Sequence, residues 1–439
     1  MKQTVFEIFS PKSSGIVRRS RSVPLPEPAS LTNSPPASLR EALRAGLKIC
    51  ERCRLDPRRS FVHSFSFLHP TFAVPALLTL LTFLFSLDSA GATPRIKEIQ
   101  VEKIGALTGP TSPNGELSAD VCGADLGTMT EIGRKIFLAF GDTFGYVNGK
   151  AIRLSGVDWR SNVFASASTD SADHDQVPRL NWRVDSTGKA IPVIDGDHLP
   201  AFVGSDGEQT KIPTAMVSIG NRIYLHYMSV HGFAPKGGVW ECNYSKFIYS
   251  DDFGKTWTPL ETPFGARDSN FNMLALTDQR GSGNEEGAYV YVFGTPCGRF
   301  GGVKLARVPV DKVQDFDSWD YYSGQANGSA AWVHDQSKAV ETIPPPVGEA
   351  SILWNPFIRR WMYTYLNENT ASIELREAEE PWGPWSAPIV VTTAHDYPQL
   401  YGAFMTPSFL KDEGKTFYFI MSMYGPYNTF LMKAKLVLE

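Results

Sequence analysis

Two aspartates stand in settings that suit acid–base chemistry. Asp125 lies in the segment Gly123-Ala-Asp-Leu-Gly127, and Asp142 comes directly after an apolar strand expected over residues 135–140. An apolar strand that ends in Gly-Asp points its carboxylate into a cavity or at a turn. Glycoside hydrolysis uses two such carboxyls, one protonated to release the leaving oxygen and one ionised to activate water or attack carbon. Asp125 and Asp142 are therefore the candidate catalytic pair.

Simpler interpretations of both aspartates stay open at this point. Asp142 also suits a turn in which the carboxylate bonds its own backbone, and Asp125 suits a turn or a metal ligand. The sequence has no G-x-S-x-G, H-E-x-x-H or P-loop motif, and Cys297 has no base beside it. Since no cluster of ligands is clear, we expect neither a metal site nor a cofactor.

Aromatic and polar side chains around these aspartates are candidates for holding a sugar. Aromatic faces stack on the C–H bonds of sugars, while amides, carboxylates and guanidinium groups bond hydroxyls. The candidate substrate-binding residues are Trp159, Arg160, Asn162, Trp240, Glu349, Asn355 and Tyr401. Each one alone also fits core packing or turn chemistry, so the prediction depends on the set. His226 alternates with apolar neighbours and is expected to be a core histidine.

These side chains have to be positioned by strands, because no long helical period occurs after residue 95. Short β-branched and aromatic runs are separated by Gly, Pro, Asn and Asp instead. A unit of strand, turn and strong apolar strand recurs near residues 118–168, 211–258, 269–309, 347–377 and 402–436. The repeat predicts an all-β fold, a five-bladed β-propeller over residues 95–439. A β-sandwich is the alternative.

One local motif favours the propeller. The segment Ser250-Asp-Asp-Phe-Gly-Lys-Thr-Trp257 is similar to the Asp-box of sialidase-like propellers, S-x-D-x-G-x-T-W. Its aspartate, Asp252, can bond the backbone of the turn, and Trp257 can pack beneath the hairpin. The motif is structural and does not identify a sugar.

The N-terminal ninety residues differ in composition from the rest. Residues 1–70 are a basic Ser/Pro/Arg-rich tail, expected to be disordered, with twelve basic and five acidic residues. Residues 71–92 hold an apolar core of roughly 16 residues followed by Ser89-Ala-Gly-Ala92, as in a secretory signal. We expect either a cleaved signal peptide or an uncleaved type II anchor. Both put the C-terminal domain in the secretory pathway or outside the cell.

Charge and sequence motifs narrow the choice of partner. The tail carries a net charge of +7 and the whole chain −4, which leaves −11 for the rest. An acidic domain is poorly suited to phosphate backbones, so we expect no nucleic acid partner. The sequons Asn243-Tyr-Ser245 and Asn327-Gly-Ser329 fit a secretory route.

The five cysteines give little evidence for a zinc site or for more than one disulfide in the domain. Cys50 and Cys53 form a lone C-x-x-C in the tail, without the second pair of a zinc site. Cys122, Cys242 and Cys297 belong to the domain. Because three is an odd number, at most one disulfide can form among them, and the sequence leaves its pairing open.

The motifs together resemble a known family. Ala124-Asp-Leu-Gly127, Phe140-Gly-Asp-Thr-Phe144 and Trp159-Arg-Ser-Asn-Val163 carry the resemblance, which continues through Gly348-Glu-Ala-Ser351 and Tyr401-Gly-Ala-Phe404. The chain is similar to domain-of-unknown-function family 4185, over most of residues 98–437. Characterised bacterial members are endo-D-arabinanases of glycoside hydrolase family 183. The resemblance implies a five-bladed propeller, α-D-arabinofuranosyl substrates, and essential aspartates at Asp125 and Asp142.

Two functions follow from these observations. The first is a secreted or surface glycoside hydrolase, endo-acting on D-arabinan-like polysaccharide, with the two aspartates as acid and base and with inversion favoured. The second is a carbohydrate-binding propeller without turnover. In both, the partner is a polysaccharide, and a membrane is contacted only through an uncleaved apolar segment. No large charge patch or peptide-groove motif supports a protein scaffold, and oligomeric state is not indicated.

Overall fold

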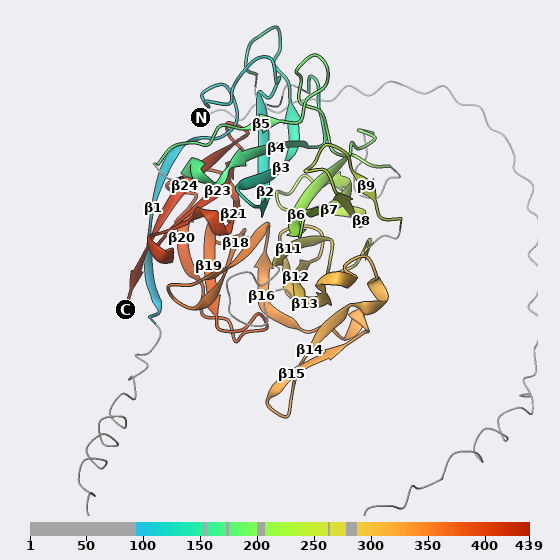
Figure 1. Ribbon diagram of the computed structural model, residues 1–439, viewed down its shortest axis with the longest axis vertical. Helices are drawn as coiled ribbons and strands as arrows, with labels where there is room; N and C mark the ends of the chain where they lie inside the picture. The colour runs from blue at the N-terminus through green and yellow to red at the C-terminus, as the bar shows by residue number, and fades with distance from the viewer. Residues whose placement is uncertain are drawn as a thin grey trace, which may run out of the picture. The chain divides into compact units, whose positions relative to one another are not determined.

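Figure 1 shows five β-sheets arranged around a common centre. The computed structural model describes residues 94–152, 154, 156–172, 175–199, 207–261, 264–277 and 288–439. Within these ranges the strands pair antiparallel and the helices are single 3₁₀ turns. The prediction of an all-β, five-bladed propeller is confirmed.

The first three sheets follow one another along the chain. Blade 1 contains β2 (Gly123–Ile132), β3 (Lys135–Phe144), β4 (Val163–Ser168) and β5 (Asn181–Trp182). Blade 2 contains β6 (Thr210–Ile219), β7 (Arg222–Phe233), β8 (Trp240–Ser250), β9 (Thr258–Pro259) and β10 (Gly265–Ala266). Blade 3 contains β11 (Met273–Thr277), β12 (Tyr289–Thr295), β13 (Gly301–Pro309), β14 (Asp320–Ala326), β15 (Ser329–Val333) and β16 (Glu341–Val347).

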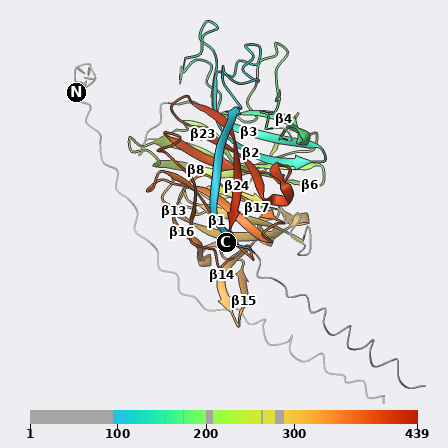
Figure 2. The same cartoon turned by 90° about the vertical axis from the view of Figure 1, so that its left-hand side faces the viewer.

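The last two sheets complete the ring. Blade 4 contains β17 (Ala350–Asn355), β18 (Arg360–Asn367), β19 (Ser372–Ala378) and β20 (Ile389–Thr393). Blade 5 contains β21 (Leu400–Phe404), β22 (Leu410–Lys411), β23 (Thr416–Met423), β24 (Asn428–Leu438) and, from the other end of the domain, β1 (Ile96–Ala106). Strand β1 pairs antiparallel with β24 from Ile96↔Leu438 to Ala106↔Phe430, and the two lie side by side in Figure 2. The two ends of the described domain therefore close the propeller.

The first strand of each blade lies at the centre. Strands β2, β6, β11, β17 and β21 contact one another in a closed ring. They can approach closely because several inward positions carry small residues, among them Ala215, Ala275 and Ala350. The second strand of each blade lies next to this ring and is buried along most of its length. Strand β3 is buried from Ile136 to Phe144, which explains its unbroken apolar sequence before Gly141.

The Asp-box forms the hairpin between β8 and β9, as predicted. Asp252 Oδ1 accepts hydrogen bonds from the Thr256 amide (2.9 Å) and the Ser250 hydroxyl (2.8 Å), and Oδ2 accepts from the Thr256 hydroxyl (2.7 Å). The Trp257 ring packs edge-on against Phe164 of blade 1, with centroids 5.3 Å apart. The motif thus fixes a hairpin of blade 2 against its neighbour.

One disulfide forms among the three domain cysteines. Cys242 on β8 pairs with Cys297 in the loop after β12, with Cα atoms 6.0 Å apart, and Cys122 is free and buried. The expectation of at most one disulfide is confirmed, and its pairing links blades 2 and 3.

The predicted tail (1–70) and signal or anchor (71–92) lie outside the described residues. Among the helices that the structure describes, none has the length and apolar character needed to span a membrane.

Candidate active site

A double irregularity in β2 positions Asp125. The register between β2 and β3 shifts on both sides of Leu126, which pairs with Phe140 while Ala124 pairs with Thr143. Leu126 takes a left-handed φ of 60°, and its amide donates to the Ser422 hydroxyl of β23 at 2.8 Å. A β-bulge of this kind re-aims a side chain, here the carboxyl of Asp125.

Gly141 leaves the space in which this carboxyl lies. A Cβ atom at Gly141 would stand 2.3 Å from Asp125 Oδ1, closer than any real contact. Asp125 Oδ2 accepts a 2.8 Å hydrogen bond from the Tyr401 hydroxyl, whereas Oδ1 is buried without a partner. Burial, followed by the nearby Asp142 charge, raises the pKa of Asp125 to about 7. The side chain is therefore suited to holding a proton near neutral pH.

Asp142 stands on the adjoining strand in a different environment. Its Oδ1 accepts hydrogen bonds from the Trp159 indole (2.8 Å) and from the Thr210 hydroxyl of β6 (2.5 Å). Burial raises the pKa of Asp142 to about 6, although both donors favour the ionised form. The Tyr401 and Tyr427 hydroxyls lower the pKa of Asp125 in the same way, so the two carboxyls differ chiefly because the Asp142 charge raises the pKa of Asp125 further.

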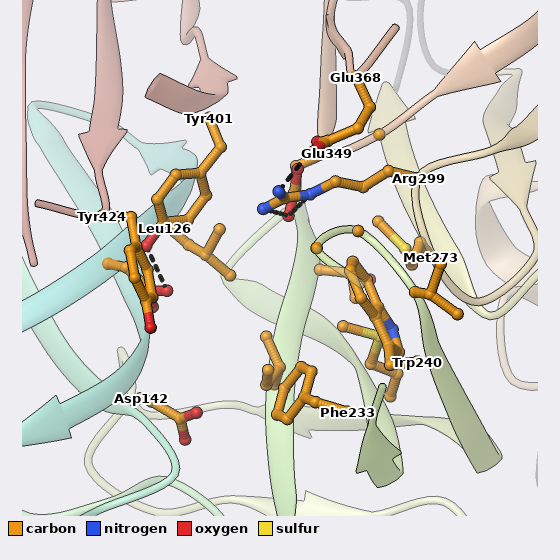
Figure 3. Close-up of a pocket in the computed structure, with 18 of the residues that line it drawn as sticks. Leu126, Asp142, Phe233, Trp240, Met273, Arg299, Glu349, Glu368, Tyr401 and Tyr424 are labelled. Atoms are coloured by element: carbon orange, nitrogen blue, oxygen red, sulfur yellow. Dashed lines mark hydrogen bonds and ion pairs between the residues drawn. The ribbon is translucent and has the colours of Figure 1, made fainter. Parts of the chain in front are cut away.

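Both aspartates line one cavity of about 840 Å³, to which all five blades contribute. Of the predicted binding residues, Trp159, Trp240, Glu349 and Tyr401 also line it. The Trp159 ring lies parallel to the imidazole of His198, with centroids 4.2 Å apart, which helps to fix the indole that holds Asp142. In Figure 3, Asp142 and Trp240 lie on different sides of the cavity and Tyr401 lies above Asp142.

A charged cluster occupies another part of the wall. Arg299 donates from Nε (3.1 Å) and Nη2 (2.9 Å) to Glu349 Oε1, and from Nη1 to Glu368 Oε2 (3.1 Å). Its guanidinium carbon lies 5.0 Å from the Tyr401 ring centre and 5.7 Å from the Trp240 ring centre. Figure 3 shows the three charged side chains on the far side of the cavity from Asp142.

Three predicted binding residues do not line the cavity and serve the fold instead. Arg160 is buried and donates to the backbone carbonyls of Asp120, Asp158 and Ala190. The amide of Asn162 is fully buried and bonds backbone groups of residues 193, 194 and 211. Asn355 likewise bonds the backbone of Phe357, Ile358 and Gly414. In each case the side chain satisfies buried peptide groups, and this use corrects the prediction of sugar contact.

Comparison with known proteins fits this architecture. The family described as Domain of unknown function (DUF4185) matches residues 111–433. The chain belongs to this family.

The individual relatives and solved structures are distant from this chain. Notoamide biosynthesis cluster protein J of Aspergillus sp. (strain MF297-2) is 31% identical over 257 residues, covering 52% of this chain and 63% of the relative, less than two thirds of its length. An uncharacterized 35.9 kDa protein of Mycolicibacterium smegmatis is 23% identical over 337 residues, covering 72% and 91%. A solved Bacteroides ovatus structure, provisionally described as a hydrolase, aligns with a TM-score of 0.51 and 12% identity, covering 72% of this chain and 86% of that one. Its likeness concerns the fold.

Several side chains at the site were not predicted from the sequence. These are Thr210, Arg299, Glu368 and Tyr427 from blades 2 to 5 and His198 from the segment between blades 1 and 2, and all but Arg299 show no pattern in their local sequence. For Arg299 a weak signal existed, since it follows the Gly-rich segment 294–298 at the end of a strong strand. The others become neighbours only when the ring closes.

The remaining expectations concern residues away from the acids. His226 is fully buried, its Nδ1 lies 2.6 Å from the Thr214 hydroxyl, and burial lowers its pKa to about 3. It is a neutral core histidine, as predicted. Within the described ranges, no group of three or more His, Cys, Asp or Glu side chains is arranged to hold a metal ion.

Proposed function

We propose that the protein is a glycoside hydrolase that cleaves an arabinofuranosyl, D-arabinan-like polysaccharide within its chain. The observation that carries the proposal is the pair of buried carboxyls on adjoining strands, with pKa values raised to about 7 and about 6. Their sequence context is the one that resembles the family 183 endo-D-arabinanases. A cavity of about 840 Å³ is large enough for several sugar units beside the pair.

The hydrogen bonds support one assignment of roles. Asp125 has an oxygen without a donor and the higher pKa, which suits the general acid. Two donors on Asp142 favour its carboxylate, which suits the general base. Asp125 would protonate the glycosidic oxygen as its bond to the anomeric carbon breaks. Asp142 would take a proton from the water whose oxygen attacks that carbon from the opposite face, with inversion.

A secreted or cell-surface location agrees with this substrate, because a polysaccharide of this kind lies outside the cytosol. The Cys242–Cys297 disulfide supports the proposal, since such bonds persist in oxidising compartments. Residues 71–92 would act either as a cleaved signal or as a type II anchor.

The experiment is product analysis of the purified full chain with D-arabinan and, in parallel, with L-arabinan. We expect oligosaccharides from D-arabinan alone, and none from the Asp142→Asn variant. Binding of D-arabinan without product after long incubation would favour the alternative, a non-catalytic carbohydrate-binding propeller. Neither binding nor product would contradict both.

A further inference from the structure

We infer that Arg299, Glu349 and Glu368 form a second sugar-binding subsite, joined to Asp125 through Tyr401, that holds the hydroxyls of a sugar further along the glycan. We call these three residues the arginine cluster. The inference rests on the proposed function for its ligand class, a glycan. It adds that the glycan must extend past Tyr401, whose ring faces Arg299 and whose hydroxyl bonds Asp125, before cleavage.

The first support is an unsatisfied acceptor. The Glu349 side chain is nine-tenths buried, and both of its bonds from Arg299 go to Oε1. Its Oε2 is buried without any hydrogen-bond partner. Buried polar atoms without a hydrogen-bond partner are uncommon in folded proteins, and each one calls for an explanation, such as a bound water or ligand. Because this oxygen is buried, a sugar hydroxyl reaches it only when the Glu349 carboxyl turns toward the cavity that the residue lines.

The second support is the charge balance of the cluster. One guanidinium faces two carboxylates, so the cluster holds more acceptors than the arginine alone can satisfy. A ligand that donates hydrogen bonds complements this excess, and a hydroxyl-rich sugar does so without adding charge. The rings of Trp240 and Tyr401 flank Arg299 and hold its guanidinium at the cavity wall.

The third support is that the cluster is built into the cavity wall. Arg299 lies between β12 and β13 of blade 3, whereas Glu349 comes just before β17 and Glu368 just after β18 of blade 4. The guanidinium therefore links two blades. A Cβ atom at Gly348 would lie 3.2 Å from Arg299 Cγ, which shows how closely the backbone approaches the arginine stem. Side chains fixed in this way bind a ligand at little cost in conformational entropy.

A similar cluster elsewhere supplies a control. Arg307 pairs with Asp320 at 3.4 Å, and its guanidinium lies over the rings of Tyr289 (4.5 Å) and Trp332 (4.2 Å). None of these four residues lines the cavity within the described part of the chain. The Asp320→Asn variant therefore disturbs the same kind of interaction without touching the proposed subsite.

The test measures binding in an Asp142→Asn background by calorimetry, so that turnover does not interfere. The ligands are a D-arabinofuranosyl hexasaccharide and methyl α-D-arabinofuranoside. Glu349→Gln keeps an acceptor for Arg299 but can replace the free oxygen with a donor. We expect its Kd for the hexasaccharide to rise about tenfold, as for a lost charge-assisted hydrogen bond, with the monosaccharide Kd changed less than twofold. Asp320→Asn should change neither.

A second variant, Arg299→Lys, keeps the positive charge but removes the planar set of guanidinium donors. It should also raise the Kd for the hexasaccharide about tenfold and leave the Kd for the monosaccharide nearly unchanged. Unchanged hexasaccharide affinity in both variants would overturn the subsite and leave the cluster as a link between blades. Equal losses for both ligands, or no hexasaccharide binding at all, would also overturn it. If the variants bind as expected but the wild-type chain releases no product from D-arabinan, the proposed function is contradicted while the subsite stands.

Discussion

At the scale of single residues, the account depends on how two similar carboxyls acquire different environments. The carboxyl of Asp125 lies close to the Gly141 backbone, and its Oδ1 has no hydrogen-bond partner. Asp142 Oδ1 instead accepts hydrogen bonds from the Trp159 indole and the Thr210 hydroxyl. Burial acts on both and raises both pKa values. The charge of Asp142 then disfavours ionisation of Asp125, so Asp125 keeps its proton to a higher pH than Asp142 does.

The pH dependence of kcat/KM should follow from this difference. Activity needs Asp142 ionised and Asp125 protonated, so it should rise as pH passes about 6 and fall as pH passes about 7. We expect a narrow bell with its maximum near pH 6.5 when initial rates on D-arabinan are measured from pH 4 to 9. A profile that is flat from pH 5 to 8 would contradict the assignment.

Gly141→Ala tests the space around Asp125. The new methyl group would stand 2.3 Å from Asp125 Oδ1, so the carboxyl must move. Because a misplacement of about 1 Å can cost about a hundredfold, kcat/KM should fall by at least that factor. Gly425→Ala is the control, since its nearest neighbour would be 3.4 Å away. Full activity in a folded Gly141→Ala protein would show that the Asp125 position is not critical.

The catalytic candidates could be found from the sequence because each sits in a local pattern. Gly-Asp after an apolar strand and Asp-Leu-Gly in a turn are both visible within five residues. Arg160, Asn162 and Asn355 were misjudged because a buried peptide group and a sugar hydroxyl call for the same donors and acceptors. Arg299 and Thr210 were missed because their neighbours come from other blades.

At the scale of elements, hairpins that fix neighbouring blades hold the site in place. The Asp-box joins β8 to β9 and packs Trp257 on blade 1. The repeated apolar strands made the five sheets predictable. The pairing of β1 with β24 was not predictable, because the two strands lie at opposite ends of the domain. Pairing over such a separation leaves no local signal.

Asp252→Ala should weaken this hairpin without affecting the chemistry. Burial alone would raise the pKa of Asp252, but hydrogen bonds from Thr256 and Ser250 outweigh it and lower the value to about 2. Losing them should reduce the free energy of unfolding by about 1–3 kcal/mol in urea denaturation, with kcat unchanged. Asp251→Ala, which removes an exposed ion pair with Arg222, should change the free energy of unfolding much less. Equal effects of both variants would contradict the structural role.

At the scale of the whole molecule, one hairpin projects away from the ring. Strands β14 and β15 extend from the propeller in both views (Figures 1 and 2). Their two-residue turn, Asn327-Gly328, has positive φ at both positions, and Asn327 is exposed. Asn243 of the other sequon instead donates to the Gly207 carbonyl and the Ser229 hydroxyl.

Entry into the secretory pathway should therefore leave a glycan at Asn327. When the full chain is expressed in a eukaryotic secreting host, endoglycosidase treatment should reduce its mass. Asn327→Gln should abolish that shift, whereas Asn243→Gln should leave it intact. A secreted protein without any shift would contradict the prediction.

The most direct test of the acid and base roles compares two variants on two substrates. An aryl furanoside with a good leaving group needs no proton from the acid, whereas a polysaccharide does. Asp125→Asn should therefore keep cleaving the aryl furanoside and lose D-arabinan cleavage, while Asp142→Asn should lose both. Polysaccharide turnover at the wild-type rate in either folded variant would contradict the account.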